Sequence, residues 1–247
     1  MKFKMTASII GTFIMAFTFL PGLNAQNSPL INNGTMESYI SMGDVQMIQT
    51  MDLRYEGVKG TPFLYEDWAE GYVVFIGRED EKQKTFKLNI NMMDNQLFVA
   101  LYDGTVGPLP SKFVKEIFFN GPEETKEHFI PMPRKQIEDL NTNESAYYQV
   151  IYQGDVLLLK HHRKSFKEAD FKGAYSSDIR YDEYKDDNRY FLSLDGKTFN
   201  KVKLKSKDLE KALPDHTQEI KSISKKEKLN LSKEEDVKKL LSLLENQ

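Results

Sequence analysis

The sequence predicts a mainly β protein with an α-helical C-terminal tail, an α+β class built on an antiparallel β-sandwich or an open, barrel-like sheet. Short runs of β-branched and aromatic residues recur about every ten residues, which is typical of such sheets. Turn dipeptides, among them Asp103-Gly104 and Asp195-Gly196, separate these runs. After Lys203 the apolar residues recur at helical spacing instead. We therefore expect an antiparallel β domain at residues 57–204 and a helical tail at 205–247 that packs on it.

The clearest hairpin covers residues 147–162, where two runs of Val, Ile, Leu and Tyr flank Gln153-Gly154-Asp155. These residue types suit a pleated, half-buried surface. Gly154 is expected to supply the positive φ of a tight turn. Residues 163–189 are charged and aromatic without a clear period, so we expect a long loop or an irregular excursion there.

Earlier strands follow from the same pattern. In the strand predicted at 85–91, Phe86, Leu88 and Ile90 alternate with polar residues, which predicts one buried and one exposed face. The segment 60–65 contains Pro62, which cannot donate a sheet hydrogen bond, so it belongs at an edge or a strand start. Further strands are expected at 72–76, 96–102, 114–119, 128–132, 190–194 and 197–204.

The tail carries helix signals. Ser206 is expected to cap a first short helix, and Ser232 with Glu235 forms a capping box for a later one. An apolar stripe follows the box at i, i+3, i+4 and i+7, made of Val237, Leu240, Leu241 and Leu244. We expect this stripe to dock on the sheet of the same chain; docking on a partner is the alternative.

The N-terminus predicts export. Lys2 and Lys4 precede a short apolar run at 9–20 and a small residue at Ala25, the pattern of a signal peptide at 1–25. An uncleaved membrane anchor is the alternative, but the run is short for a membrane span. Residues 26–56 are interpreted as an N-terminal arm or linker. Its methionines could bind copper(I), but no His or Cys accompanies them, so packing is the preferred interpretation.

Composition excludes several classes of function. The chain has no cysteine, which rules out disulfides, thiolate chemistry and a lipid-modified cysteine. Cleavage after residue 25 removes two lysines and leaves 32 basic against 37 acidic residues, a net charge near −5. This charge argues against nucleic acid as a partner. No phosphate loop, dinucleotide fingerprint or hydrolase motif occurs, and we expect no cofactor and no transmembrane segment after cleavage.

Three aromatic residues near the start of the β domain are candidate ligand-binding residues. Tyr65, Trp68 and Tyr72 could stack on a sugar or cradle an acyl chain, although packing in the core is the more common role of such residues. No catalytic or metal-ligating residue is predicted.

Two further groups of residues, a histidine pair and an acidic stretch, are alternative candidates for a metal site. His161 and His162 are adjacent on a strand and point to opposite faces, so they cannot share a metal without a bulge; we expect a strand end that emerges into solvent. The acidic stretch 178–188 has oxygens for calcium but lacks the EF-hand pattern, and a solvated loop is the default.

The sequence also resembles a group of uncharacterised exported proteins of Bacteroidota. The resemblance covers most of the chain after residue 25 and is carried by structural glycines, aromatics and caps: Gly60-Thr61-Pro62-Phe63-Leu64 with Trp68 and Gly71, the hairpin with its Gly154-Asp155 turn, Asp195-Gly196-Lys197, Lys205, Asp208-Leu209, Leu229 and Glu235-Asp236-Val237. It implies the envelope of a Gram-negative bacterium as the address, in the periplasm or at the cell surface, and it implies no activity.

These observations favour a non-enzymatic binding or assembly protein of the bacterial envelope, whose partner is another envelope protein or a surface polymer. A carrier of a lipid or other apolar ligand is the first alternative, and it predicts a large apolar cavity between sheet and helices. A hydrolase with a carboxylate pair is the second, and it predicts close acids in a cleft with displaced pKa values.

Overall fold

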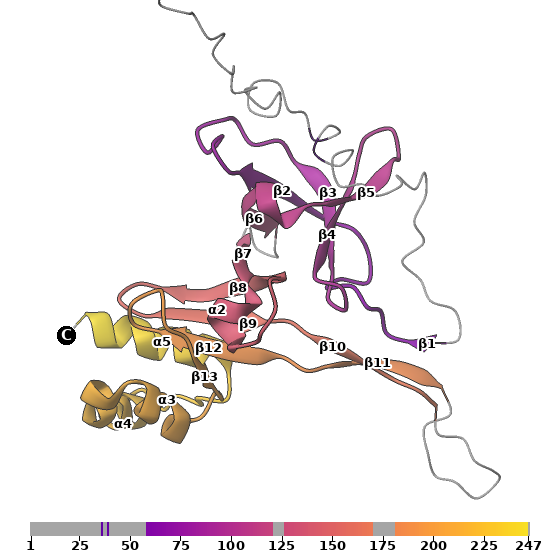
Figure 1. Cartoon of the computed structure of the whole chain (residues 1–247). Coiled ribbons are helices and arrows are strands. Elements are labelled where there is room, and N and C mark those ends of the chain that lie inside the picture. Colours follow the sequence, from indigo (N-terminus) through magenta and orange to yellow (C-terminus); the bar gives the residue numbers. More distant parts are fainter. Residues whose placement is uncertain (1–35, 37–38, 40–57, 121–125, 170–180, 247) are drawn as a thin grey trace, which may run out of the picture. The chain divides into compact units, whose positions relative to one another are not determined.

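The computed structural model describes residues 36, 39, 58–120, 126–169 and 181–246 (Figure 1). The predicted signal peptide and most of the predicted arm lie outside these residues. Within them, the chain is mainly β and is organised around one antiparallel sheet of ten strands, in the order β13-β12-β9-β8-β7-β6-β2-β3-β4-β5. The strands are β2 (Ala69–Phe75), β3 (Phe86–Asn91), β4 (Gln96–Ala100), β5 (Val106–Leu109), β6 (Val114–Asn120), β7 (Lys126–Pro133), β8 (Ser145–Gln153), β9 (Leu157–His161), β12 (Arg189–Ser193) and β13 (Asn200–Val202).

The sheet is open, with β5 and β13 at its two edges, and the mainly β, antiparallel class is confirmed. Its tight turns follow local chemistry. Asn95 connects β3 to β4 at φ 54°, Gly104 connects β4 to β5 at φ 87°, and Gly196 connects β12 to β13 at φ 66°. Asparagine and glycine tolerate this left-handed region better than other residues, so the turn residues confirm the hairpins predicted there.

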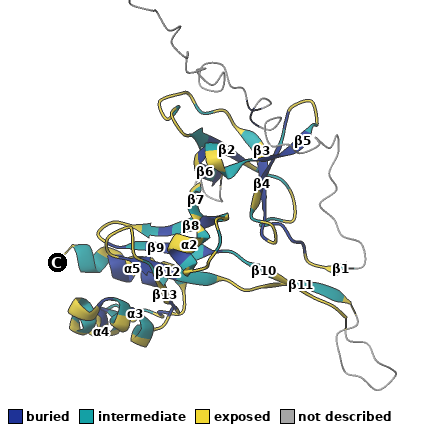
Figure 2. Cartoon of the chain, viewed as in Figure 1, coloured by how far each residue is buried: buried dark blue, intermediate teal, exposed yellow. Residues whose placement is uncertain are grey.

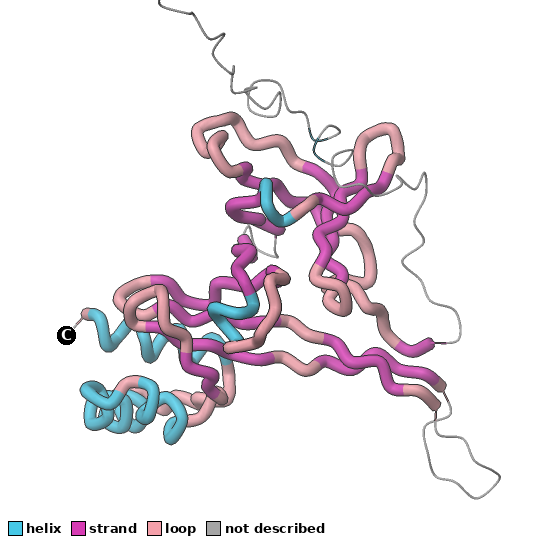
Figure 3. The backbone as a smooth tube through the Cα atoms, in the orientation of Figure 1, coloured by secondary structure: helices cyan, strands magenta, loops and turns pink. Residues whose placement is uncertain are grey.

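The prediction of a long loop at 163–189 is wrong for the described residues of this stretch, 163–169 and 181–189. β10 (Lys164–Lys167) and β11 (Asp182–Asp186) form an antiparallel pair, and β1 (Val58–Lys59) joins β11 in parallel register to make a three-stranded sheet (Figure 3). Phe166 lies opposite Tyr184, with ring centroids 5.1 Å apart. The paired residues are far apart in the sequence and mostly charged, so no local alternation of apolar and polar residues predicts these strands.

The predicted helical tail contains α3 (Ser206–Ala212), the 3₁₀ turn η3 (Pro214–His216), α4 (Thr217–Lys226) and α5 (Glu234–Glu245). Earlier in the described part of the chain lie the 3₁₀ turn η1 (Ser111–Phe113) and the short helix α2 (Arg134–Glu138), the latter in a segment expected to be a polar linker. Among the described residues, no helix combines the length and apolar character needed to cross a bilayer.

The predicted stripe of α5 docks on the same chain. Val237, Leu240 and Leu241 are buried in one cluster with Leu158 and Leu192 of the sheet, as Figure 2 shows in dark blue on α5 and the nearby strands. Leu244 is partly buried against the same cluster. The alternative, docking of this stripe on a partner, is therefore not needed to explain its apolar character.

Both predicted serine caps are wrong. No side chain caps α3 or α5; the preceding residues are Lys205 and Lys233. Ser206 donates to Glu210 within the helix at 2.6 Å, and Ser232 donates to Asn230 at 2.7 Å. The three acidic residues in the first turn of α5 interact favourably with the helix dipole there instead.

Gly154 has a different role from the one predicted. Its φ is not positive, unlike that of Gly60, Gly77, Gly104 and Gly196. A Cβ at this position would overlap with the carboxylate of Glu245, at the end of α5. That carboxylate accepts hydrogen bonds from Tyr152 Oη and the Asp155 amide, each at 2.6 Å. Gly154 therefore makes room for the contact that ties α5 to the hairpin.

Candidate functional site

A segment at 61–68 lies along β3 and places Trp68. Leu64 N donates to Ile90 O at 2.8 Å, and the amide of Asn89 donates to Tyr65 O at 3.0 Å and to Asp67 O at 3.2 Å. This segment covers the face of β3 that was expected to be exposed, so Asn89 is fully buried there. The prediction of one polar, exposed face is wrong at this end of the strand, because an asparagine can satisfy the backbone of the covering segment.

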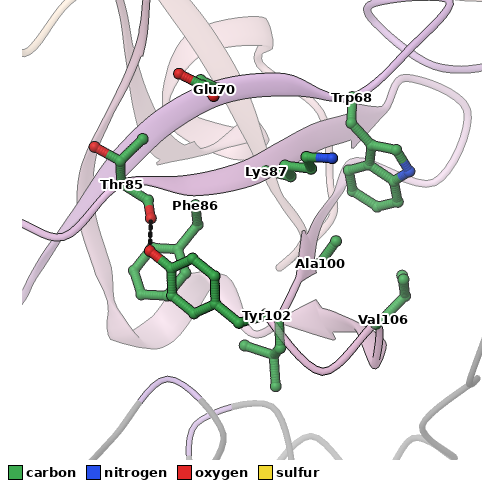
Figure 4. Close-up of a pocket in the computed structure, with 10 residues that line it drawn as sticks. Trp68, Glu70, Thr85, Phe86, Lys87, Ala100, Tyr102 and Val106 are labelled. Atoms are coloured by element: carbon green, nitrogen blue, oxygen red, sulfur yellow. Dashed lines mark hydrogen bonds between the residues drawn. The ribbon is translucent and has the colours of Figure 1, made fainter.

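Beyond the covered part, the same face of the sheet opens into a groove of about 690 Å³ (Figure 4). Lys87 of β3 lies opposite Glu70 of β2 and Ala100 of β4, so these three residues form a transverse row on one face. Lys87 and Glu70 are exposed, and no ion pair between them is found among the described residues. The floor of the groove therefore presents one ammonium and one carboxylate to solvent.

Aromatic rings stand at the two ends of the groove. Trp68 packs its partly buried ring against a small cluster that includes Phe98 and Val106. At the other end, Tyr102 is 87% exposed, yet its hydroxyl donates to Thr85 O at 2.9 Å and its ring centroid lies 6.2 Å from that of Phe86. Figure 4 shows Lys87 extending between the tryptophan and the tyrosine ends. The tyrosine ring is thus held in place although water surrounds it.

This arrangement suits binding better than hydrolysis. Rings that are fixed and accessible can stack on flat, partly apolar groups, and the charged ends on the floor can hydrogen-bond to hydroxyls. Glu70 is the single acid among the described lining residues, so the lining holds no carboxylate pair of the kind a glycosidase uses.

The three aromatic residues predicted as a binding group lie in three different environments. Tyr65 packs on Phe119 at 5.1 Å between ring centroids and donates to Glu127 at 2.6 Å. Burial, together with this carboxylate, raises the pKa of Tyr65. Trp68 lines the groove, and Tyr72 stacks on Phe118 at 4.9 Å. The three residues were grouped because they are close in sequence, but the fold places their side chains in separate surroundings.

Lys87 and Tyr102, by contrast, were not predicted as site residues from the sequence. Lys87 belongs to the site through its register with β2 and β4, which no local motif reveals. One feature of the sequence could have indicated Tyr102. It is a large aromatic residue directly before the Asp103-Gly104 turn, where side chains are rarely buried.

His161 and His162 do not emerge into solvent, so that expectation is wrong. They point to opposite faces, as expected from the strand geometry. His161 Nδ1 lies 2.9 Å from Glu138 Oε1, and its Nε2 lies 3.2 Å from Asn95 Oδ1. His162 Nε2 lies 2.7 Å from Gln149 Oε1. Burial lowers the pKa of both histidines, that of His162 to about 3.

Glu138 is the centre of a buried polar cluster. It accepts hydrogen bonds from Tyr148 Oη at 3.0 Å and Arg134 Nε at 3.2 Å. Burial alone would raise the pKa of Glu138, but the contacts with His161, Tyr148 and Arg134 outweigh it and lower the pKa to about 2. The carboxylate therefore stays ionised. Its Oε1 receives these contacts, whereas its buried Oε2 accepts no hydrogen bond among the described residues and lies 3.7 Å from Arg189 Nη1. This cluster fixes α2 on the sheet and offers no accessible reactive group.

The described acids of the 178–188 stretch are engaged with neighbouring groups. Asp182 accepts from the Ala169 amide at 2.7 Å, Glu183 lies 3.3 Å from Lys185, and Asp187 lies 3.0 Å from Arg189. Within the described residues, no group of three or more His or acidic side chains is placed to hold a metal ion. Asp178 lies outside the described residues.

The site is thus an open groove with an aromatic ring at each end. The chain matches no protein-family model, and no match to it is found among the curated proteins or the solved structures. Its function is therefore inferred from the chemistry of its own residues.

Proposed function

We propose that the protein is an exported, non-enzymatic binding protein of a Gram-negative envelope, and that the groove over β2–β5 binds a glycan segment of a surface polymer. The observation that supports this most strongly is the pair of accessible, fixed rings of Trp68 and Tyr102 at the two ends of one groove. The predicted signal peptide and the resemblance to exported Bacteroidota proteins support the address.

A glycan fits the mixed chemistry of the groove. A sugar ring has a flat face of C–H groups that stacks on an aromatic ring, and a rim of hydroxyls that both donate and accept hydrogen bonds. Lys87 can donate to such hydroxyls and Glu70 can accept from them. A purely apolar ligand would leave both charges without partners, which costs free energy.

Binding to a panel of soluble polysaccharides, measured by affinity gel electrophoresis, tests this function. The panel contains glucomannan, amylopectin, mannan and the anionic polygalacturonate. We expect retardation by at least one of them, and about tenfold weaker binding in Trp68→Ala and Tyr102→Ala, since each variant removes one stacking ring. Tyr102 is highly exposed, so its replacement leaves the core intact.

Phe166→Ala is the matched control, because it removes an exposed ring from β10, outside the groove. Wild-type affinity in this variant is the expected result. If Tyr102→Ala and Trp68→Ala bind like the wild type, or if no polymer binds, the groove is not a glycan site, and crosslinking to an envelope protein becomes the next experiment.

A further inference from the structure

The outer edge of β13 has no partner strand in the described part of the chain. β13 is the last strand of the ten-stranded sheet and pairs only with β12, which places Lys201 opposite Phe191 and Val202 opposite Tyr190. No backbone hydrogen bond on its other side is found among the described residues. An edge of this kind presents N–H and C=O groups with which a further extended segment can pair.

An open groove of about 420 Å³ lies between this edge and α3, which is next to β13 in Figure 1. The lining of this lysine groove contains three lysines, Lys201, Lys203 and Lys211, and one acid, Asp208. The lysines are exposed, and none of the four residues forms an ion pair within the described parts of the chain. Asp208 lies in the first turn of α3, where the helix dipole favours a carboxylate. The lysine groove therefore carries a net positive charge without a counter-charge.

The lysines flank the strand edge from two sides. Val202 and Leu204 are buried in the cluster that contains the helices, so the alternating residues Lys201 and Lys203 lie on the opposite face. Lys211 belongs to α3, on the face of Val202. A strand added at this edge would meet two lysines on one face and one lysine on the other.

We propose that the edge of β13 and the lysine groove bind an extended, acidic segment of a partner protein, which pairs with β13 as an additional strand. Opposite charges on neighbouring strands attract, and like charges repel. The lysines therefore disfavour pairing of this edge with the same edge of a second copy, and they favour an acidic segment. The lysine groove shares no residue with the groove over β2–β5, so this proposal does not depend on glycan binding.

A synthetic peptide tests the proposal on the full mature chain by fluorescence polarisation. The probe is a fluorescein-labelled peptide of seven residues with Glu at alternate positions and Thr between them, because Thr favours an extended conformation. The contact is short, so we expect a Kd on the order of 10 μM. A variant that combines Lys201→Gln, Lys203→Gln and Lys211→Gln should bind about tenfold more weakly, since it loses three ammonium groups.

The matched control combines Lys225→Gln with Lys226→Gln, which removes two exposed lysines of α4 outside the lysine groove. Its affinity should equal that of the wild type. All five lysines are exposed, so the substitutions leave the core intact. If the peptide does not bind the wild type, or if it binds the triple variant equally well, the proposal is wrong.

Two further peptides separate strand addition from attraction between charges alone. The same peptide with N-methylated amides keeps its charge but has no backbone donors, so we expect at least tenfold weaker binding. A peptide with Lys in place of Glu should not bind. In the complex with the first peptide, the amides of residues 200–203 should exchange with deuterium more slowly. Equal binding of the N-methylated peptide would show that no strand is added, and equal binding of the Lys peptide would show that charge does not select the partner.

Discussion

At the scale of single residues, Gly154 shows how a missing side chain positions a helix. The space that a Cβ would fill at this position is taken by the Glu245 carboxylate, which bonds to the β8–β9 turn. We expect Gly154→Ala to lower the Tm by about 3 °C, because the Glu245 carboxylate must swing away and loses its hydrogen bonds to the turn. Thermal unfolding followed by circular dichroism measures this shift.

A variant that combines Gly154→Ala with Glu245→Ala tests whether the carboxylate causes the lowered Tm. In Glu245→Ala the carboxylate is gone, so adding Gly154→Ala should cost clearly less than it does in the wild-type chain. Such coupling is the signature of two residues that compete for one space. Equal costs in both backgrounds would mean that the alanine acts on the backbone or on the unfolded chain instead.

His162 makes stability depend on pH. Burial first, and then the nearby Lys160 and Lys164, lower its pKa to about 3, while Glu234 acts in the opposite direction. A depressed pKa means that the unfolded chain binds the proton first, so this contribution to stability is complete above about pH 6.5 and is lost as the pH falls toward 3. We expect about 2 kcal/mol less free energy of unfolding from this residue at pH 5 than at pH 7.

Urea denaturation at the two pH values measures the effect, with His162→Phe as the comparison. The phenylalanine keeps a ring near Phe129 and cannot titrate, so the loss between pH 7 and pH 5 should be smaller in this variant. His161 has a lowered pKa as well and titrates in the same direction, which leaves some pH dependence in place. An unchanged loss would show that His162 is not held neutral in the fold.

At the scale of elements, local chemistry explains what the sequence could predict. Hairpins at Asp103-Gly104 and Asp195-Gly196 were predictable because the turn residues themselves favour the left-handed conformation. The apolar stripe of α5 was predictable because all of its residues recur at helical spacing within one continuous segment. β5 was missed because Gly107 and Pro108 are poor strand formers, and it exists through its pairing with β4.

The same distinction applies to the candidate site. Trp68 could be selected from the sequence as a rare aromatic residue near a Gly-Thr-Pro segment, but its neighbours in the groove come from other strands. Lys87 meets Glu70 through register, and Tyr72 meets Phe118 and His128 through register as well. A shift of one residue would reverse every one of these faces, and no single-sequence pattern fixes it.

At the scale of the whole molecule, the packing between sheet and helices distinguishes the proposed binding protein from a carrier of an apolar ligand. A carrier needs a large apolar cavity between sheet and helices. In the described residues, Leu158 and Leu192 of the sheet and Ile220 of α4 are fully buried in one cluster with α5. The pocket between β13 and α3 is open, about 420 Å³ in volume, and lined mainly by polar and charged residues. The groove lies elsewhere, on β2–β5, and is open to solvent.

Native mass spectrometry of the protein, purified gently from its own envelope, gives the corresponding prediction. We expect a bare chain that begins at Gln26, because the open, mainly polar pocket beside the helices retains no lipid and an open groove releases a soluble glycan quickly. A bound species of a few hundred daltons, lost on denaturation, would contradict the binder and favour the carrier. A stoichiometric protein adduct would show that the partner is an envelope protein.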